Sequence, residues 1–232
     1  MNKLTHKLLA KLNIAVALIV SMVLAGSLGG ITYVFASGTS NFTQTINAGT
    51  LSLDIVDGSY ASVSSPTMAM PAATFSFACQ SKIGYFGTST QQIYVSNPDA
   101  AANGWTVSLA ASSTADVWAS AGTPFDFNDP TASGCTDSAD TGDTVGGQMT
   151  VDPSVGSIAQ GPSANGTTGL SLGSSSAFEE GVTDTITILT SDGTTDIGDW
   201  TLQSVKITQT LPAEQPAASD YNIDMVLSIA AS

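Results

Sequence analysis

Residues 126–143 carry the side chains of this chain that are best suited to holding a cation. The segment reads DFNDPTASGCTDSADTGD and contains no basic residue. Its oxygen-bearing candidates are Asp126, Asn128, Asp129, Asp137, Asp140 and Asp143. Calcium takes about six to eight oxygen ligands from carboxylates, amides and backbone carbonyls, and a loop can supply them. The spacing does not match an EF-hand loop, so the segment indicates either another kind of calcium site or a solvated acidic loop tied down by Cys135.

The chain is poorly supplied for catalysis. Its only histidine, His6, lies in the N-terminal export signal described below, so the exported part would have no imidazole for general base catalysis or for a Ser/His/Asp triad. A cysteine nucleophile would lack its histidine partner, and no HExxH zinc motif is present. The adjacent Glu179 and Glu180 would point to opposite faces of a strand. These residues argue against an enzyme.

Three tryptophans, Trp105, Trp118 and Trp200, could offer a stacking platform to a glycan. However, Trp105 and Trp200 lie in segments where polar and apolar residues alternate, which is typical of strands with one face in the core. Packing in the core is therefore favoured over glycan binding.

Two cysteines, Cys79 and Cys135, complete the set of reactive side chains. An even number of cysteines in an exported chain predicts a disulfide. Two buried free thiols are the alternative, but no metal-ligand partners accompany either cysteine. In the chain-entropy model a bridge across this span would stabilise the fold by about 4 kcal/mol.

The N-terminal segment predicts export. Three lysines precede a mostly apolar run over residues 12–36, which ends in small residues, and this order is typical of a secretory signal. Cleavage by signal peptidase is expected between Ala36 and Ser37, which gives a signal at 1–36 and one domain at 37–232. An uncleaved anchor is the alternative, because the run is long enough to span a bilayer. The chain would then meet a membrane only through this segment.

The charge of the exported part excludes several partners. The chain has no arginine, and residues 37–232 hold only Lys82 and Lys206 against all 19 acidic residues, a formal charge of −17. Such a surface repels nucleic acid, whose binding depends on Lys and Arg at the phosphates, and it repels an anionic membrane. It favours solubility and attracts cations. Together with the signal, this composition predicts a secreted or cell-surface location.

From Thr45 onward the pattern is that of an all-β protein. Alternating or β-branched runs predict strands at 50–55, 74–79, 92–95, 105–110, 147–151, 167–172, 185–189, 200–207 and 221–229. Clusters of Gly, Pro, Asn and Asp separate these runs, and no helical periodicity is visible after the signal. We therefore expect a single jelly-roll-like antiparallel β-sandwich after an N-terminal hydrophobic helix.

Three details of strand arrangement are also expected. The short gap between 92–95 and 105–110 predicts an antiparallel pair. Near Gln203 or Ser204 the alternation changes phase, which predicts a β-bulge. The segment 209–225, with its proline-containing turn before an alternating strand, resembles the last hairpin of bacterial surface and pilus-type β-domains.

Residues 29–33 (GGITY), Phe42 and residues 48–53 (AGTLSL) mark the junction between the signal and the first strand. This junction resembles the TasA/camelysin family of secreted surface proteins. The resemblance implies an exported, jelly-roll-like β-sandwich that builds extracellular fibres, as in a biofilm matrix. The zinc-protease activity attached to the camelysin name has no visible ligands in this sequence.

Two functions are compatible with the sequence. The first is a structural surface or extracellular matrix protein that self-associates into filaments. After cleavage, residues 37–44 would form an uncharged tail that can pair with an open sheet edge of a neighbour, with Phe42 and Ile46 on one side of the added strand. The second is a monomeric cell-surface binding module for calcium or a glycan, suggested by residues 126–143 and the tryptophans.

Overall fold

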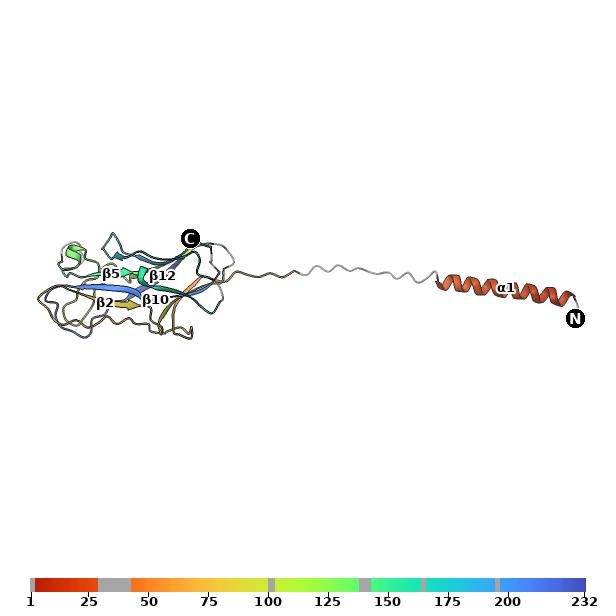
Figure 1. Cartoon of the computed structure of the whole chain (residues 1–232), viewed down its shortest axis with the longest axis horizontal. Coiled ribbons are helices and arrows are strands. Elements are labelled where there is room, and N and C mark those ends of the chain that lie inside the picture. The colour runs from red at the N-terminus through yellow and green to blue at the C-terminus, as the bar shows by residue number, and fades with distance from the viewer. Residues whose placement is uncertain (1–2, 29–42, 100–102, 138–142, 164–165, 195–196) are drawn as a thin grey trace. The chain divides into compact units, whose positions relative to one another are not determined.

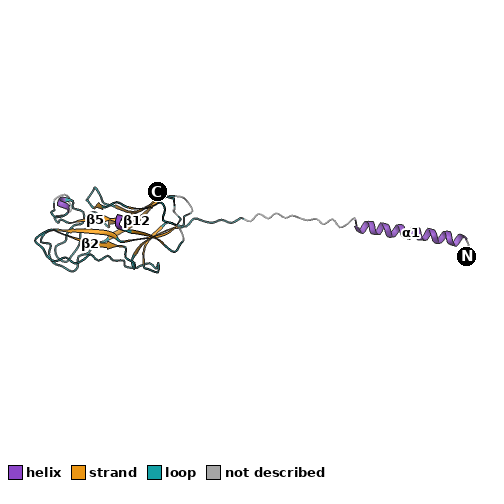
Figure 2. Ribbon diagram, viewed as in Figure 1, coloured by secondary structure: helices purple, strands orange, loops and turns teal. Residues whose placement is uncertain are grey.

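The computed structural model describes residues 3–28, 43–99, 103–137, 143–163, 166–194 and 197–232. The chain divides into two compact units, Met1–Ile46 and Asn47–Ser232. Figure 1 traces the chain from end to end, and Figure 2 shows a helix in the first unit and strands throughout the second.

The first unit contains one helix, α1 (Lys3–Leu28). Its segment Thr5–Leu24 is long and apolar enough to cross a membrane by length and composition, a test that signal sequences near an N-terminus also pass. The helix is thus compatible with the predicted signal. The expected cleavage site at Ala36 and Ser37, and the tail residue Phe42, lie outside the described residues.

The second unit has its described strands in three four-stranded antiparallel sheets. The first sheet has the order β1 (Ser52–Val56), β3 (Gln92–Asn97), β10 (Gly198–Gln203), β6 (Ser157–Gln160). The second has the order β2 (Gln80–Phe86), β11 (Val205–Leu211), β5 (Gln148–Asp152), β8 (Ser176–Ala177). The third has the order β12 (Met225–Ala231), β4 (Trp105–Ala111), β9 (Ile186–Ser191), β7 (Leu170–Leu172). The predicted all-β sandwich after an N-terminal helix is confirmed.

The first two sheets are joined by three continuous passages of chain. β2 leads to β3, β5 leads to β6 through the short 3-10 helix Pro153–Val155, and β10 leads to β11. The pairings continue across these passages, because β10 pairs with β3 and β6 while β11 pairs with β2 and β5. The two sheets therefore form one bent layer, and the third sheet is the other layer of the sandwich.

Ser204 is the residue at which β10 becomes β11. It has a left-handed backbone with φ of 62°, and its N–H donates to the carbonyl of Gly87 at 2.8 Å. The phase change predicted as a bulge near Gln203 or Ser204 is therefore a passage between two sheets. A bulge and a sheet change both insert one residue into the alternation, so the sequence pattern does not separate them.

The core lies between the bent layer and the third sheet. Trp105 of β4 and Trp200 of β10 are fully buried, and their ring centroids lie 5.7 Å apart. The Trp200 Nε1–H donates to the carbonyl of Gly166 at 2.9 Å. The predicted core position of these two tryptophans is confirmed, so neither can stack on a glycan.

The strand predicted at 74–79 is wrong. This segment is a loop, in which Phe75 and Phe77 pack edge to face with centroids 5.3 Å apart while Phe77 is 81% exposed. The strand begins only at Gln80, because β2 pairs with β11 from that residue onward. The prediction was based on local alternation, whereas the observed strand begins where β11 is available for pairing.

Two predicted pairings are also wrong. β3 and β4 do not pair, since β3 lies between β1 and β10 while β4 lies between β12 and β9. The expected last hairpin is absent for the same reason, because β11 and β12 belong to different layers. In a sandwich a short connection can cross to the other layer, and burial of both apolar faces decides between the two routes.

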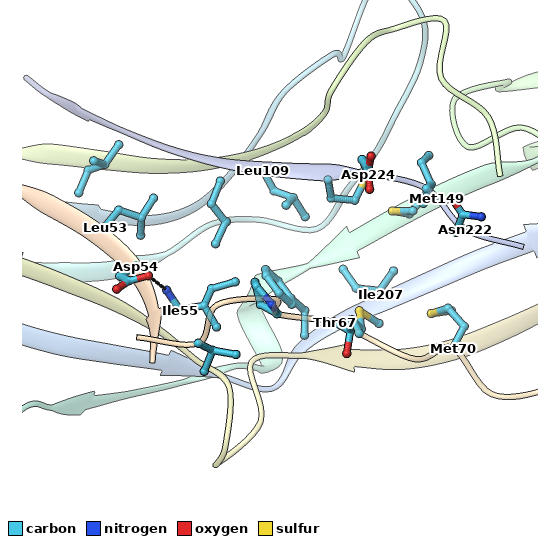
Figure 3. A pocket seen from close by; sticks show the side chains of 18 of the residues that line it. Leu53, Asp54, Ile55, Thr67, Met70, Leu109, Met149, Ile207, Asn222 and Asp224 are labelled. Carbon is cyan, nitrogen blue, oxygen red and sulfur yellow. Dashed lines mark hydrogen bonds between the residues drawn. The ribbon is translucent and has the colours of Figure 1, made fainter. Parts of the chain in front are cut away.

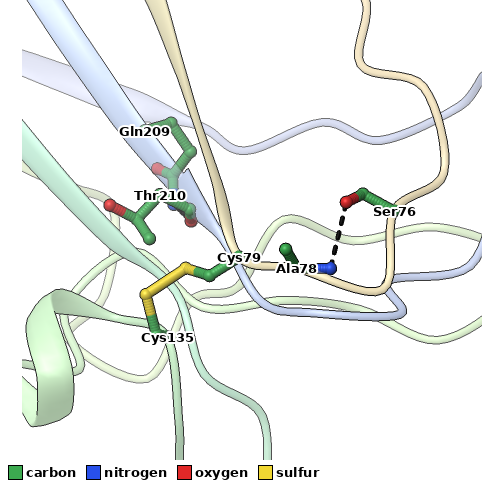
Figure 4. The surroundings of a disulfide bond; sticks show 6 residues. All are labelled: Ser76, Ala78, Cys79, Cys135, Gln209 and Thr210. Atoms are coloured by element: carbon green, nitrogen blue, oxygen red, sulfur yellow. Dashed lines mark hydrogen bonds between the residues drawn. A yellow bond between two sulfur atoms is a disulfide. The ribbon is translucent and has the colours of Figure 1, made fainter.

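The disulfide predicted between Cys79 and Cys135 is confirmed, with a Cα–Cα distance of 5.6 Å and a sequence separation of 56. Figure 4 shows it joining the segment before β2 to the loop that follows the 3-10 helix Thr131–Ser133. Next to it, the Ala78 N–H donates to Ser76 Oγ at 3.0 Å. The bridge fixes the middle of the acidic segment to the edge of the second sheet.

Candidate functional site

An apolar groove of about 900 Å³ runs along one side of the sandwich, between the edge strands β1 and β12. Its floor contains Leu109 of β4, Met149 of β5 and Ile207 of β11, all buried in the core. Figure 3 shows these three side chains among those that line the groove, together with Leu53 of β1 and Asp224, which precedes β12. The core is therefore reached from outside along this groove.

The β12 rim lines the groove with alternate side chains. Met225, Leu227 and Ile229 line it and are half-buried, whereas Val226 faces away and is 46% exposed. The strand predicted at residues 221–229 alternates in this way, although β12 itself begins only at Met225. The same alternation determines whether the backbone N–H and C=O groups of each β12 residue point toward β4 or away from it.

In an antiparallel ladder, alternate residues direct both their N–H and C=O toward the same neighbouring strand. The carbonyl of Asp224 accepts from the Ser112 N–H at 3.1 Å, and the Ser232 N–H donates to Gly104 at 2.8 Å. Even-numbered residues of β12 therefore face β4. Odd-numbered residues, Leu227 among them, direct their backbone groups away from β4, and no described strand pairs with that edge.

The opposite rim, β1, is partly covered. The Val63 N–H donates to the carbonyl of Ile55 at 2.9 Å, and the Ile55 N–H is held by Asp54 Oδ1 at 2.7 Å. Figure 3 shows the latter bond at the edge of the groove. The C-terminal end of β1 is thus less available to a new strand than β12.

The other described edge strands carry features that discourage pairing. β6, β7 and β8 have only four, three and two residues, and short edges limit pairing. β2 has seven residues but includes Lys82, and lysine on an edge has the same effect. β12 has seven residues, MVLSIAA, with no charge and no proline. It is the described edge best suited to accept another strand.

One end of the groove is aromatic and polar. Trp118 stacks on Phe125 with centroids 5.5 Å apart, and Phe125 meets Tyr221 edge to face at 4.9 Å. The Trp118 Nε1–H donates to Oε1 of the buried Gln209 at 2.9 Å. Trp118 and Tyr221 line the groove, so this is the place where a flat or hydroxylated group would find partners.

The first half of the acidic segment is built into the fold. Asp126, Asn128 and Asp129 are buried. Oδ1 of Asp126 accepts from the Phe127 N–H at 2.6 Å, and Oδ1 of Asp129 accepts from the Thr131 N–H at 2.8 Å. The Asn128 amide donates to the carbonyl of Thr114 at 2.7 Å. These side chains hold turns in place.

The side chains in the second half of the acidic segment do not take part in these turns. Asp137 is exposed, Asp143 Oδ1 accepts from the Val145 N–H at 2.9 Å, and Asp140 lies outside the described residues. The described residues contain no group of three or more His, Cys, Asp or Glu arranged to hold a metal. Calcium binding by this segment remains a prediction.

Two charged contacts lie away from the groove. Lys206 Nζ lies 2.9 Å from Asp152 Oδ2, and hydrogen bonds from Ser154 and Lys206 lower the pKa of Asp152. Tyr94 donates from its hydroxyl to Asp199 Oδ2 at 2.7 Å, and burial together with this bond raises the pKa of Tyr94 to about 12. Both pairs join neighbouring strands of one layer.

Sequence reasoning missed the groove and the open edge of β12. The alternation of residues 221–229 was visible, but whether a strand lies at an edge depends on its neighbours. The absence of charged residues from β12 was the one sequence signal that could have indicated an edge strand that is covered or paired by another segment.

Comparison of this chain with protein-family models, curated proteins and solved structures finds no match.

Proposed function

We propose that this protein is an exported structural protein of the cell surface or extracellular matrix, which assembles into fibres by adding the N-terminal strand of one copy to another. The observation that carries the proposal is the uncharged open edge of β12 beside an apolar groove. An incoming strand can pair with this edge and place alternate side chains in the groove.

The donor is the segment after the expected cleavage site, residues 37–47. It contains no charge and no proline, so it can supply an uninterrupted ladder of backbone groups. Ile46 is 87% exposed. On an extended strand Phe42 and Ile46 fall on the same side, about 13 Å apart.

The energetics favour a tail with apolar anchors. Burying a phenylalanine or isoleucine side chain contributes about 1.5–3 kcal/mol, and each net backbone hydrogen bond about 0.5–1.5 kcal/mol. These gains oppose the cost of ordering the tail, about 1–2 kcal/mol per residue. Gln44 lies on the same side as Phe42 and Ile46, and the polar end of the groove at Asn222 and Asp224 can receive it.

The tail and the acceptor edge are different surfaces of one molecule. Contact between two different patches is head to tail, and when the rotation does not close it produces an open filament. Strand addition between copies of this chain would therefore form a fibre without a second kind of protein.

Export, removal of the signal and a location at the surface belong to the same proposal. The apolar helix α1 and the disulfide are compatible with it, and the resemblance of residues 29–53 to the TasA/camelysin family supports it. In this proposal the domain is a building unit and not an enzyme.

The test uses the mature protein, residues 37–232, examined by electron microscopy and sedimentation. We expect filaments from the wild type, and a folded monomer with unchanged β-sheet circular dichroism after deletion of residues 37–44. A matched control replaces the same residues by a Gly/Ser segment of equal length, which keeps the length but removes the Phe42 anchor. Filaments that persist in both variants would exclude the tail as the linking strand.

A monomeric binding module is the second candidate, and the aromatic end of the groove at Trp118 and Tyr221 is the observation that favours it. It predicts a monomer at every concentration. It also predicts a rise in melting temperature with a soluble glycan or with millimolar calcium, through preferential binding to the folded state. Sedimentation of the wild type separates the two functions.

A further inference from the structure

The groove is lined with methionine. The chain has six methionines, of which Met1 and Met22 belong to the N-terminal segment. The other four are Met68, Met70, Met149 and Met225, and all four line the groove. Elsewhere the core is filled mainly by valine, isoleucine, leucine and aromatic residues. The thioethers of residues 43–232 are therefore gathered at a single place.

These methionines come from three separate parts of the chain. Met68 and Met70 lie in the loop between β1 and β2, above Gly84, where an added β-carbon would be 2.6 Å from Met68 Cε and 2.7 Å from Met70 Sδ. Met149 comes from β5 and Met225 from β12. Figure 3 shows Met70 and Met149 beside Ile207 at the same end of the groove.

Methionine side chains suit a surface that must receive another chain. They are unbranched and polarizable, so they adjust to the shape of an incoming side chain, and sulfur packs favourably on aromatic rings. Phe42 of the proposed donor strand supplies such a ring. The same sulfur atoms are open to oxidation, and oxidation turns a flexible apolar side chain into a polar one.

We propose that methionine oxidation in this groove is a switch that prevents strand addition, with Met68, Met70 and Met225 as the modified residues. This inference rests on the proposed function, because it regulates the same acceptor groove. The occupant that oxidation excludes is the N-terminal strand of a second copy.

The reaction is balanced with hydrogen peroxide as the oxidant. The thioether sulfur attacks one peroxide oxygen, an S–O bond forms and the O–O bond breaks. Sulfur gives up two electrons, and after proton transfer the products are the sulfoxide and water. Both cysteines of the chain are joined in the disulfide, so no thiol of this protein competes for the peroxide.

Burial sets the order of modification. Met68, Met70 and Met225 are half-buried and reachable from the groove, whereas Met149 is only 3% exposed. A sulfoxide on any of the first three places a strong hydrogen-bond acceptor in a mainly apolar groove, where it opposes the burial of Phe42 and Ile46. A strand already in place would cover the same sulfur atoms.

The experiment treats the exported mature protein with hydrogen peroxide as a monomer and measures oxidation at each methionine by mass spectrometry and assembly by light scattering. We expect sulfoxides at Met68, Met70 and Met225 before Met149. The critical concentration for assembly should rise about tenfold or more. Methionine sulfoxide reductases should restore it. In preformed filaments the three methionines should oxidise more slowly than in the monomer.

The matched control is the triple variant Met68→Leu, Met70→Leu and Met225→Leu, a change that keeps apolar volume. It should assemble and lose its sensitivity to peroxide. If the triple variant does not fold, the single variant Met225→Leu replaces it as the control. Assembly of this single variant should be partly protected against peroxide.

The outcomes separate the two proposals. Untreated wild-type protein that never assembles overturns the proposed function and the switch with it. Wild-type protein that assembles equally well with sulfoxides at all three positions overturns the switch alone. A leucine variant that remains fully sensitive to peroxide also overturns it, because the damage then lies elsewhere.

Discussion

The Ser204 N–H donates to the carbonyl of Gly87 at 2.8 Å, which joins two of the three passages of chain between the first and second sheets. Both residues have left-handed backbones, with φ of 62° and 81°. A residue with a β-carbon is strained in this region. This pair lies where the layer bends from the first sheet to the second.

We expect Ser204→Gly to change the free energy of unfolding by less than about 1 kcal/mol, since glycine adopts the left-handed region freely. Ser204→Val should lower it by about 1–3 kcal/mol, because a β-branched residue resists positive φ. Urea unfolding followed by circular dichroism measures both. Equal stability of the two variants would show that the bend tolerates any residue.

Removal of the disulfide should destabilise the domain. Cys135→Ser is expected to lower the free energy of unfolding by about 2–5 kcal/mol, because the unfolded chain gains freedom across the span from Cys79. The double variant Cys79→Ser with Cys135→Ser should lose a similar amount. Thiol titration of the native wild type should detect no reactive cysteine, and two reactive groups would contradict the bridge.

Tyr94 should ionise only at a pH well above the ordinary pKa of a tyrosine. Burial and the bond to Asp199 raise the pKa of Tyr94 to about 12, above its ordinary value of 10.0. The protonated form is favoured in the folded state, so this contribution to stability is complete below pH 10 and is lost as pH rises toward 12. Asp199→Asn should bring the pKa partway back toward 10. Ultraviolet titration of tyrosinate measures it, and an unchanged late ionisation in the variant would assign the shift to burial alone.

Asp152 should contribute to acid sensitivity. Hydrogen bonds from Ser154 and Lys206 lower the pKa of Asp152 below its ordinary value of 3.8. Its contribution is therefore present above about pH 4 and is lost as pH falls through the lowered folded-state pKa. Asp152→Asn should reduce stability at pH 7 by about 1 kcal/mol or less, as for a partly exposed ion pair, and by nothing in strong acid. Denaturant titrations across pH 2–7 test this, and a gap between wild type and variant that does not close with acid would contradict it.

Neighbouring residues of β12 should respond differently to a new charge. Leu227 lines the groove and Val226 faces away from it. Leu227→Lys places an ammonium where the added strand must pack, and we expect loss of filaments with the monomer still folded. Val226→Lys extends into solvent and should assemble at a concentration within a few-fold of wild type. If both lysines block assembly equally, the groove is not the acceptor.

The sequence alone determined what depends on local pattern and on counting. Alternation at residues 105–110 and 221–229 placed strands and their buried faces, because side chains alternate along any strand. With only two cysteines, Cys79 and Cys135, a single intramolecular bridge was available. The apolar run before residue 36 predicted the N-terminal helix, because hydrophobicity along the chain is also a local pattern.

The tertiary structure decided which strands are neighbours. The loop at 74–79 alternates like a strand but is part of no sheet, and β3 and β4 are close in sequence yet lie in different layers. Pairing joins residues far apart in the chain, so it is selected by burial of both layers together and not by local pattern. For that reason only the folded chain shows that β12 lies at an open edge and that Met68, Met70, Met149 and Met225 meet in one groove.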